Sequence, residues 1–206
     1  MCAQCNDKNR RILLIDDNEA IHADVRKLLG AGQAHAAGLD EVEATLFGDI
    51  AVNERANGFE IDSAYQGQEG LEMVRQALRA GRSYALAFVD IRMPPGWDGI
   101  TTIARLWQED PHLEVVICTA HADYTWETMV QTLGETDHLL ILKKPFDNIE
   151  VRQLASALCE KWNLACQVRR TVDDLEEAVA ERTRELQERK EQLEQTHAQL
   201  LQAQKL

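Results

Sequence analysis

The sequence predicts an α/β fold, a five-stranded doubly wound parallel sheet, followed by a long C-terminal helix. In the first part of the chain, short apolar runs alternate with longer amphipathic stretches, a pattern typical of βαβ units. The right-handed crossovers of such units cover both faces of a parallel sheet with helices. After Pro145 the chain contains neither glycine nor proline, which predicts one uninterrupted helix.

Five apolar runs have the length and composition of buried strands. They cover residues 12–15, 59–65, 84–89, 113–118 and 139–142. Apolar residues at helical spacing predict helices over residues 19–29, 67–80, 99–108 and 122–133, with a fifth beginning near Asp147. His22 is expected on the exposed surface of the first helix.

The connection over residues 30–58 is far longer than is usual between a helix and a strand, which marks it as an insertion. One helical face within it is apolar and predicts an extra helix, formed by Leu39, Val42, Leu46, Phe47 and Ile50. This helix is expected either to pack on the domain or to contact a partner subunit.

Charge and cysteine content limit the possible partners and the compartment. The 206 residues carry a formal net charge of −13, which disfavours direct binding to nucleic acid or to an anionic membrane. No apolar run is long enough to span a bilayer, and the N-terminus lacks a signal peptide's apolar stretch. Five scattered cysteines fit a reducing compartment. A cytoplasmic protein without membrane insertion is expected.

Polar side chains that could take part in catalysis or ligand binding follow four of the predicted strands. They are Asp16 and Asp17 after the first strand, Asp90 after the third, Thr119 after the fourth and Lys144 after the fifth. The carboxyl ends of parallel strands meet at one edge of the sheet, where α/β proteins bind their ligands. We therefore expect these five side chains to form one site.

Three carboxylates at one edge of a sheet repel one another unless a cation lies between them. Mg²⁺ prefers oxygen ligands, so two carboxylates, a backbone carbonyl and a phosphate oxygen suit it. One aspartate could then act as a nucleophile toward phosphorus, while Lys144 and the Thr119 hydroxyl hold the phosphoryl oxygens. The predicted product is an aspartyl phosphate.

Four segments carry a resemblance to a known family. In chain order they are ILLIDDNEA, LAFVDIRMP, VVICTA and LKKPF. Together they resemble the receiver domain of two-component response regulators, over residues 11–163 apart from the insertion. The resemblance implies a flavodoxin-like sheet of order 2-1-3-4-5. It also implies that Asp90 accepts a phosphoryl group from a histidine kinase or a phosphotransfer protein.

The resemblance also implies roles for the surrounding residues. Asp16 and Asp17 form the acidic pair. The metal site consists of Asp16, Asp17, Asp90 and the backbone carbonyl of Arg92, of which Asp17, Asp90 and the carbonyl hold Mg²⁺. Thr119 corresponds to the switch hydroxyl and Lys144 to the lysine that contacts the phosphoryl group, followed by a cis peptide to Pro145. Ile141 stands where the family is commonly aromatic. Apart from the resemblance, His121 lies just beyond Thr119, where it is expected either to tune water access to the phosphoryl group or to be a plain exposed histidine.

The C-terminal residues 164–206 are predicted to form a signalling coiled coil continuous with the last receiver helix, after an N-terminal tail (1–10) and the receiver (11–163). One apolar column repeats every seven residues and predicts the seam of a homodimer. Its positions are Val172, Val179, Leu186, Leu193 and Leu200. The companion column becomes polar at Arg182, Arg189 and Thr196. A helix from Asp147 to Leu206 would span about 90 Å.

The final 26 residues resemble the linkers that precede histidine kinase domains, and similar coils precede diguanylate cyclase domains. The expected function is therefore a phosphoaccepting receiver that is not itself an enzyme and controls an output domain of a larger protein. A histidine kinase is the first expectation for that output, and a diguanylate cyclase is the alternative. A haloacid-dehalogenase-like phosphatase is a further alternative, although that superfamily carries its nucleophile on the first strand.

Overall fold

The computed structural model describes residues 8–30, 58–120, 131–134 and 136–203, with side chains up to Glu194. The chain divides into two compact units, Met1–Asn163 and Leu164–Leu206. Some predicted features lie outside the described residues. They are most of the N-terminal tail, the helix within the insertion, His121 and most of the helix over residues 122–133.

Five parallel strands form the sheet of the first unit in the order β2-β1-β3-β4-β5, which confirms the predicted fold and strand order. The strands are β1 (Arg11–Ile15), β2 (Glu60–Ala64), β3 (Leu86–Asp90), β4 (Glu114–Thr119) and β5 (Leu139–Lys143). β1 pairs with β2 on one side and with β3 on the other. The strand order therefore reverses between β1 and β3, where α/β sheets open a crevice at their carboxyl edge.

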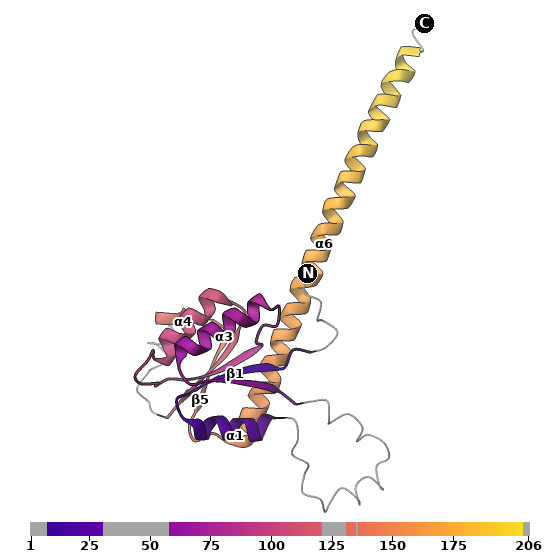
Figure 1. The fold of residues 1–206 in the computed structure, drawn as a ribbon. Helices are drawn as coiled ribbons and strands as arrows, with labels where there is room; N and C mark the ends of the chain where they lie inside the picture. The colour runs from indigo at the N-terminus through magenta and orange to yellow at the C-terminus, as the bar shows by residue number, and fades with distance from the viewer. Residues whose placement is uncertain (1–7, 31–57, 121–130, 135, 204–206) are drawn as a thin grey trace, which may run out of the picture. The chain divides into compact units, whose positions relative to one another are not determined.

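Helices cover both faces of this sheet (Figure 1). The helices are α1 (Glu19–Leu29), α3 (Gly67–Arg79), α4 (Gly99–Glu109) and α6 (Asn148–Ala203). Because side chains alternate along a strand, Leu13 and Ile15 join the core under α3 and α4, whereas Ile12 and Leu14 join the core with α1 and the start of α6. The two cores bury all of β3 and all of β1 except its first residue, Arg11, between helical layers.

The predicted bounds agree with the structure within about two residues. α1 begins and ends at the predicted residues. Its start is fixed by Asn18, whose side-chain oxygen accepts a hydrogen bond from the Ala20 amide. β2 is shorter than predicted, since Phe59 forms only an isolated bridge with Gly30. β3 ends at Asp90, so the residue expected to follow the strand is its last member.

An ionic cluster at the amino ends of β4 and β5 holds the last turns of α6 that belong to the first unit. The Glu114 side chain is fully buried and accepts from Lys161 Nζ (3.1 Å) and contacts His138 Nδ1 (2.9 Å). Lys161 also donates to the Asp137 carbonyl (2.5 Å). The hydrogen bond from Lys161 also lowers the pKa of the Asp137 carboxyl. The buried charge of Glu114 is thus compensated by a residue of α6.

We expect Lys161→Met to reduce the free energy of unfolding by about 2 kcal/mol, because it leaves the buried Glu114 carboxylate with His138 alone. The measurement is urea unfolding in a double-mutant cycle with Glu114→Gln. The coupling energy should reach about 1 kcal/mol. Costs that simply add would contradict the ion pair.

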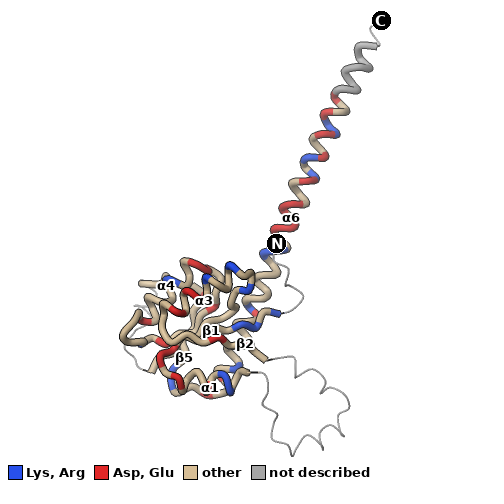
Figure 2. Tube along the Cα trace, viewed as in Figure 1, with Lys and Arg blue, Asp and Glu red and all other residues tan. Residues whose placement is uncertain are grey.

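The second unit consists of a helix, the continuation of α6 from Leu164. Its large apolar side chains are exposed in the single chain: Leu164, Val168, Val172, Leu175, Val179, Leu186 and Leu193. Its charged residues are acidic over residues 173–181, and acidic and basic residues are interspersed from Arg182 onward (Figure 2). The latter form ion pairs such as Arg182 to Glu185 (2.6 Å). The side chain of Leu200, a predicted seam residue, lies outside the described residues. In the described part of the chain, no helix combines the length and apolarity that crossing a bilayer requires.

Candidate functional site

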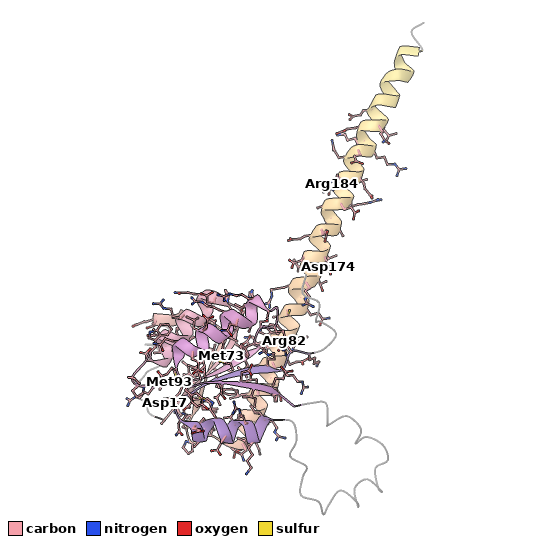
Figure 3. All side chains as sticks on the ribbon, viewed as in Figure 1. Asp17, Met73, Arg82, Met93, Asp174 and Arg184 are labelled. Atoms are coloured by element: carbon pink, nitrogen blue, oxygen red, sulfur yellow. The ribbon has the colours of Figure 1, made fainter. Side chains whose placement is uncertain are left out.

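Three aspartates lie at the carboxyl edge of the sheet, where β1 and β3 end. Figure 3 shows Asp17 at this edge and Arg82 at the opposite end of the sheet. Asp16 is buried and directly follows β1, Asp17 is exposed, and Asp90 closes β3 with 8% of its surface exposed. Each carboxylate offers an oxygen within 4.8 Å of the others. The strand-end pattern thus brings together the three aspartates that the sequence analysis selected.

Lys144 connects the two buried aspartates. It follows β5, and its Nζ donates to Asp16 Oδ2 and to Asp90 Oδ1, both at 2.7 Å. The Lys144 amide donates to the Thr119 carbonyl (2.7 Å), and the peptide to Pro145 is cis, as the resemblance implies. The end of β5 therefore places an ammonium group between Asp16 and Asp90.

The protonation of this cluster depends on burial and on the ion pairs. Burial raises the pKa of Asp90, while the hydrogen bond and charge of Lys144 act against the shift. For Lys144, burial alone would lower the pKa, but hydrogen bonds to Asp16 and Asp90 outweigh it, so the pKa is raised. Lys144 is therefore held as a cation that offsets part of the negative charge.

The residues present fit a magnesium ion. Both Asp16 oxygens accept hydrogen bonds, from the Asn18 amide (2.9 Å) and from Lys144, and both Asp90 oxygens accept from Lys144 and the Arg92 amide. Each of these oxygens keeps a second lone pair for a metal, and Asp17 is the exposed carboxylate of the cluster. Oxygens on opposite sides of an octahedral Mg²⁺ lie about 4 Å apart. This spacing is compatible with the three aspartates, which each offer an oxygen within 4.8 Å of the others. Hard carboxylate oxygens are also the donor type that Mg²⁺ selects.

The segment after β3 folds back on Asp90. The Arg92 amide donates to Asp90 Oδ2 (3.1 Å), which brings the Arg92 backbone to the cluster, while its carbonyl remains a predicted ligand. Gly99 lies so close that an added Cβ would stand 2.5 Å from the Asp90 carbonyl oxygen. Only glycine permits this approach, and Asp98 then caps α4 through the Thr101 amide (2.7 Å).

Thr119 and Ile141 lie on neighbouring strands close to the cluster. Thr119 is buried as the last residue of β4 and pairs with Lys143 in the sheet. Ile141 pairs with Ile117 and packs, partly buried, against the core under α3 and α4. Two neighbouring strands thus carry Thr119, the predicted switch hydroxyl, and Ile141, the position that is commonly aromatic in the resembled family. His121, predicted just beyond Thr119, lies outside the described residues.

The prediction that His22 lies on the surface was wrong. The structure buries it, with 1% of its surface exposed, because its ring hydrogen-bonds to the Asp16 carbonyl (2.7 Å) and to Ser63 Oγ (2.8 Å). A signal was present in the sequence, since His22 precedes Val25 by three and Leu29 by seven positions. It shares their buried helix face.

Comparison with family models identifies one domain. The model described as the response regulator receiver domain matches residues 49–156. This match begins after β1, yet the structure places β1 and the acidic pair at the centre of the same sheet. The insertion separates them in sequence. A search of curated protein sequences finds no match.

Solved structures of similar fold cover most of the chain. An adenylate cyclase from Rhodopirellula baltica aligns with a TM-score of 0.57 and 18% identity, over 80% of this chain and 98% of that one. The receiver domain of an HD domain-containing protein from Pseudomonas fluorescens Pf-5 gives 0.54 and 20%, over 78% and 94%. A CheY-like receiver from Methanospirillum hungatei JF-1 gives 0.53 and 19%, over 76% and 98%. At these identities the likeness shows the fold.

Proposed function

Because the chain belongs to the response regulator receiver domain family of two-component signalling, we propose that Asp90 accepts a phosphoryl group with Mg²⁺ bound beside it. The donor is a histidine kinase or a phosphotransfer protein. The observation that carries this proposal is the Lys144 ammonium bridging Asp16 and Asp90 at 2.7 Å inside a three-carboxylate cluster. Uptake of one phosphoryl group from a small donor tests it, as the Discussion describes.

In the proposed step, a carboxylate oxygen of Asp90 attacks phosphorus, and the bond from phosphorus to the donor's imidazole nitrogen breaks. The new bond is an acyl phosphate on Asp90, and the donor nitrogen leaves with the electron pair. Lys144, already 2.7 Å from Asp90 Oδ1, exchanges part of this contact for a phosphoryl oxygen. The Thr119 hydroxyl at the end of β4 binds a second phosphoryl oxygen.

The proposed metal ligands are Asp17, Asp90 and the Arg92 carbonyl, with Asp16 beside them. Bound Mg²⁺ supplies positive charge to the phosphoryl oxygens. Asp16 contributes by holding Lys144 through Oδ2 and the Asn18 amide through Oδ1, which keeps the turn after β1 in place.

Asp17→Asn is expected to weaken Mg²⁺ binding at least about tenfold, because it removes a carboxylate that binds the metal directly. Thr119→Ala serves as the matched comparison, since its hydroxyl acts on the phosphoryl group. It should change the affinity little. Isothermal titration with MgCl₂ measures both, and a stronger effect of Thr119→Ala would show that the metal ligands are misassigned.

The phosphatase alternative loses support from the position of the nucleophile. A haloacid-dehalogenase-like enzyme carries its nucleophile on its first strand, whereas here Asp90 closes β3 and the acidic pair follows β1. The family match and the strand order both favour a receiver.

The output proposal concerns residues 164–206. We infer that they pair with a second copy of the chain as a coiled coil and transmit the state of Asp90 to an output domain. The exposed apolar column Val172, Val179, Leu186 and Leu193 supports pairing. A histidine kinase domain remains the proposed output and a diguanylate cyclase the alternative. The coding sequence after codon 206 distinguishes the two.

A further inference from the structure

His22 makes contacts that its position on α1 did not suggest. Its Nε2 lies 2.7 Å from the Asp16 carbonyl oxygen, its Nδ1 lies 2.8 Å from Ser63 Oγ, and its ring packs 4.6 Å from the Tyr65 ring. We propose that His22 is a positioning residue that sets the orientation of the acidic pair for Mg²⁺ binding. This inference rests on the proposed function of the site.

The contact to Asp16 determines the role of each ring nitrogen. A carbonyl oxygen only accepts hydrogen bonds, so Nε2 carries the hydrogen and donates it. The Asp16 amide also donates to the Ala64 carbonyl (3.2 Å). Both backbone polar groups of Asp16 are therefore held, one by α1 and one by β2.

Holding the Asp16 carbonyl also orients Asp17. The peptide unit between the two residues is planar, so the direction of the Asp16 carbonyl sets the direction of the Asp17 amide and the position of its Cα. Asp17 lies at the exposed side of the cluster, where the described contacts hold its side chain less than that of Asp16. His22 thus fixes the backbone from which the proposed metal ligand extends.

The ring of His22 is itself fixed from β2. Ser63 occupies β2 opposite Leu14 of β1, and its hydroxyl contacts Nδ1. Tyr65, two residues further, covers the ring. With 1% of its surface exposed and both nitrogens in contact, His22 is not arranged to accept a phosphoryl group itself. Positioning is the role that this burial permits.

Two conservative variants separate the two nitrogens. In His22→Gln the side-chain amide nitrogen takes the place of Nε2 and keeps a donor for the Asp16 carbonyl. In His22→Asn the amide nitrogen takes the place of Nδ1 and keeps only the contact to Ser63. Losing a group that holds a metal ligand in place typically costs 10–100-fold in metal affinity, so we expect His22→Asn to weaken Mg²⁺ binding about tenfold. His22→Gln should stay within about threefold of the wild type.

The experiment is isothermal titration of the full chain with MgCl₂, with Val25→Ala as control. Val25 is buried on the same helix face. Its truncation creates a cavity there, while the valine side chain has no group that could hydrogen-bond to Asp16. Equal Mg²⁺ affinities for the Asn and Gln variants would overturn the proposal. A loss in Val25→Ala as large as in His22→Asn would also overturn it, because mere destabilisation of α1 would then explain the effect.

A metal-free measurement separates this inference from the proposed function. Hydrogen exchange of the Asp16 and Asn18 amides in EDTA should be faster in His22→Asn than in wild type and His22→Gln. If the wild type does not bind Mg²⁺ but this exchange order holds, the positioning stands and the proposed function fails. If the wild type binds Mg²⁺ but the exchange rates are equal, the function stands and the positioning fails.

Discussion

Asp90→Asn is expected to reduce phosphoryl uptake from acetyl phosphate to background, and EDTA is expected to do the same to the wild-type chain. The amide of asparagine has no carboxylate oxygen to attack phosphorus. Its size is similar, and its one oxygen can still accept from either Lys144 or the Arg92 amide, the two donors to Asp90. Intact-protein mass spectrometry measures the uptake as the addition of one phosphoryl group.

A matched control for this experiment is Asp24→Asn on the exposed side of α1, which should take up the phosphoryl group like the wild type. It carries the same chemical change at a distance from the cluster. Equal labelling of the wild type and Asp90→Asn, or labelling that survives EDTA, would contradict the assignment of the acceptor and of the metal.

The second large effect is expected on the oligomeric state. A chain that ends near Leu164 should be monomeric, because it lacks the apolar column of residues 172–200. Within the full chain, Leu186→Asp combined with Leu193→Asp removes four leucines from the dimer, two from each copy. Since each buried leucine contributes about 2 kcal/mol, the dimer should weaken by on the order of 10⁵-fold or more. Light scattering over a concentration series measures both.

The control for the paired substitution adds the same charge outside the seam. Gln187→Asp combined with Gln195→Asp introduces two carboxylates at neighbouring positions that face away from the partner in the heptad pattern. This variant should remain dimeric. If the shortened chain or the leucine variant stays as dimeric as the full chain, association runs through the receiver instead.

The sequence was sufficient to predict the sheet and the convergence of Asp16, Asp90 and Lys144. Strand ends in a parallel sheet share one edge, so residues directly after the strands must meet there, whatever the rest of the chain does. The register of the strands then placed these side chains within hydrogen-bond distance. The local sequence pattern and the topology of the sheet therefore led to the same prediction.

Contacts of buried polar side chains with specific partner groups were not predictable in this way. His22 is polar at a buried helix position, and only the Asp16 carbonyl and Ser63 explain its burial. Glu114 likewise begins an apolar strand, and its partners are His138 in the turn before β5 and Lys161 on α6. Hydrophobic periodicity gives the face of a residue but does not identify the group that satisfies it.

The bridge between Gly30 and Phe59 has a consequence for how this domain tolerates changes in chain length. The two residues pair, and the Phe59 amide donates to the Leu29 carbonyl (3.2 Å), so the long connection leaves and re-enters the domain at adjacent points. The entropy of closing such a loop grows only with the logarithm of its length, by about 0.6 kcal/mol per doubling. Through loop closure alone, halving or doubling the length of the connection should therefore shift the folding equilibrium by less than one typical core substitution.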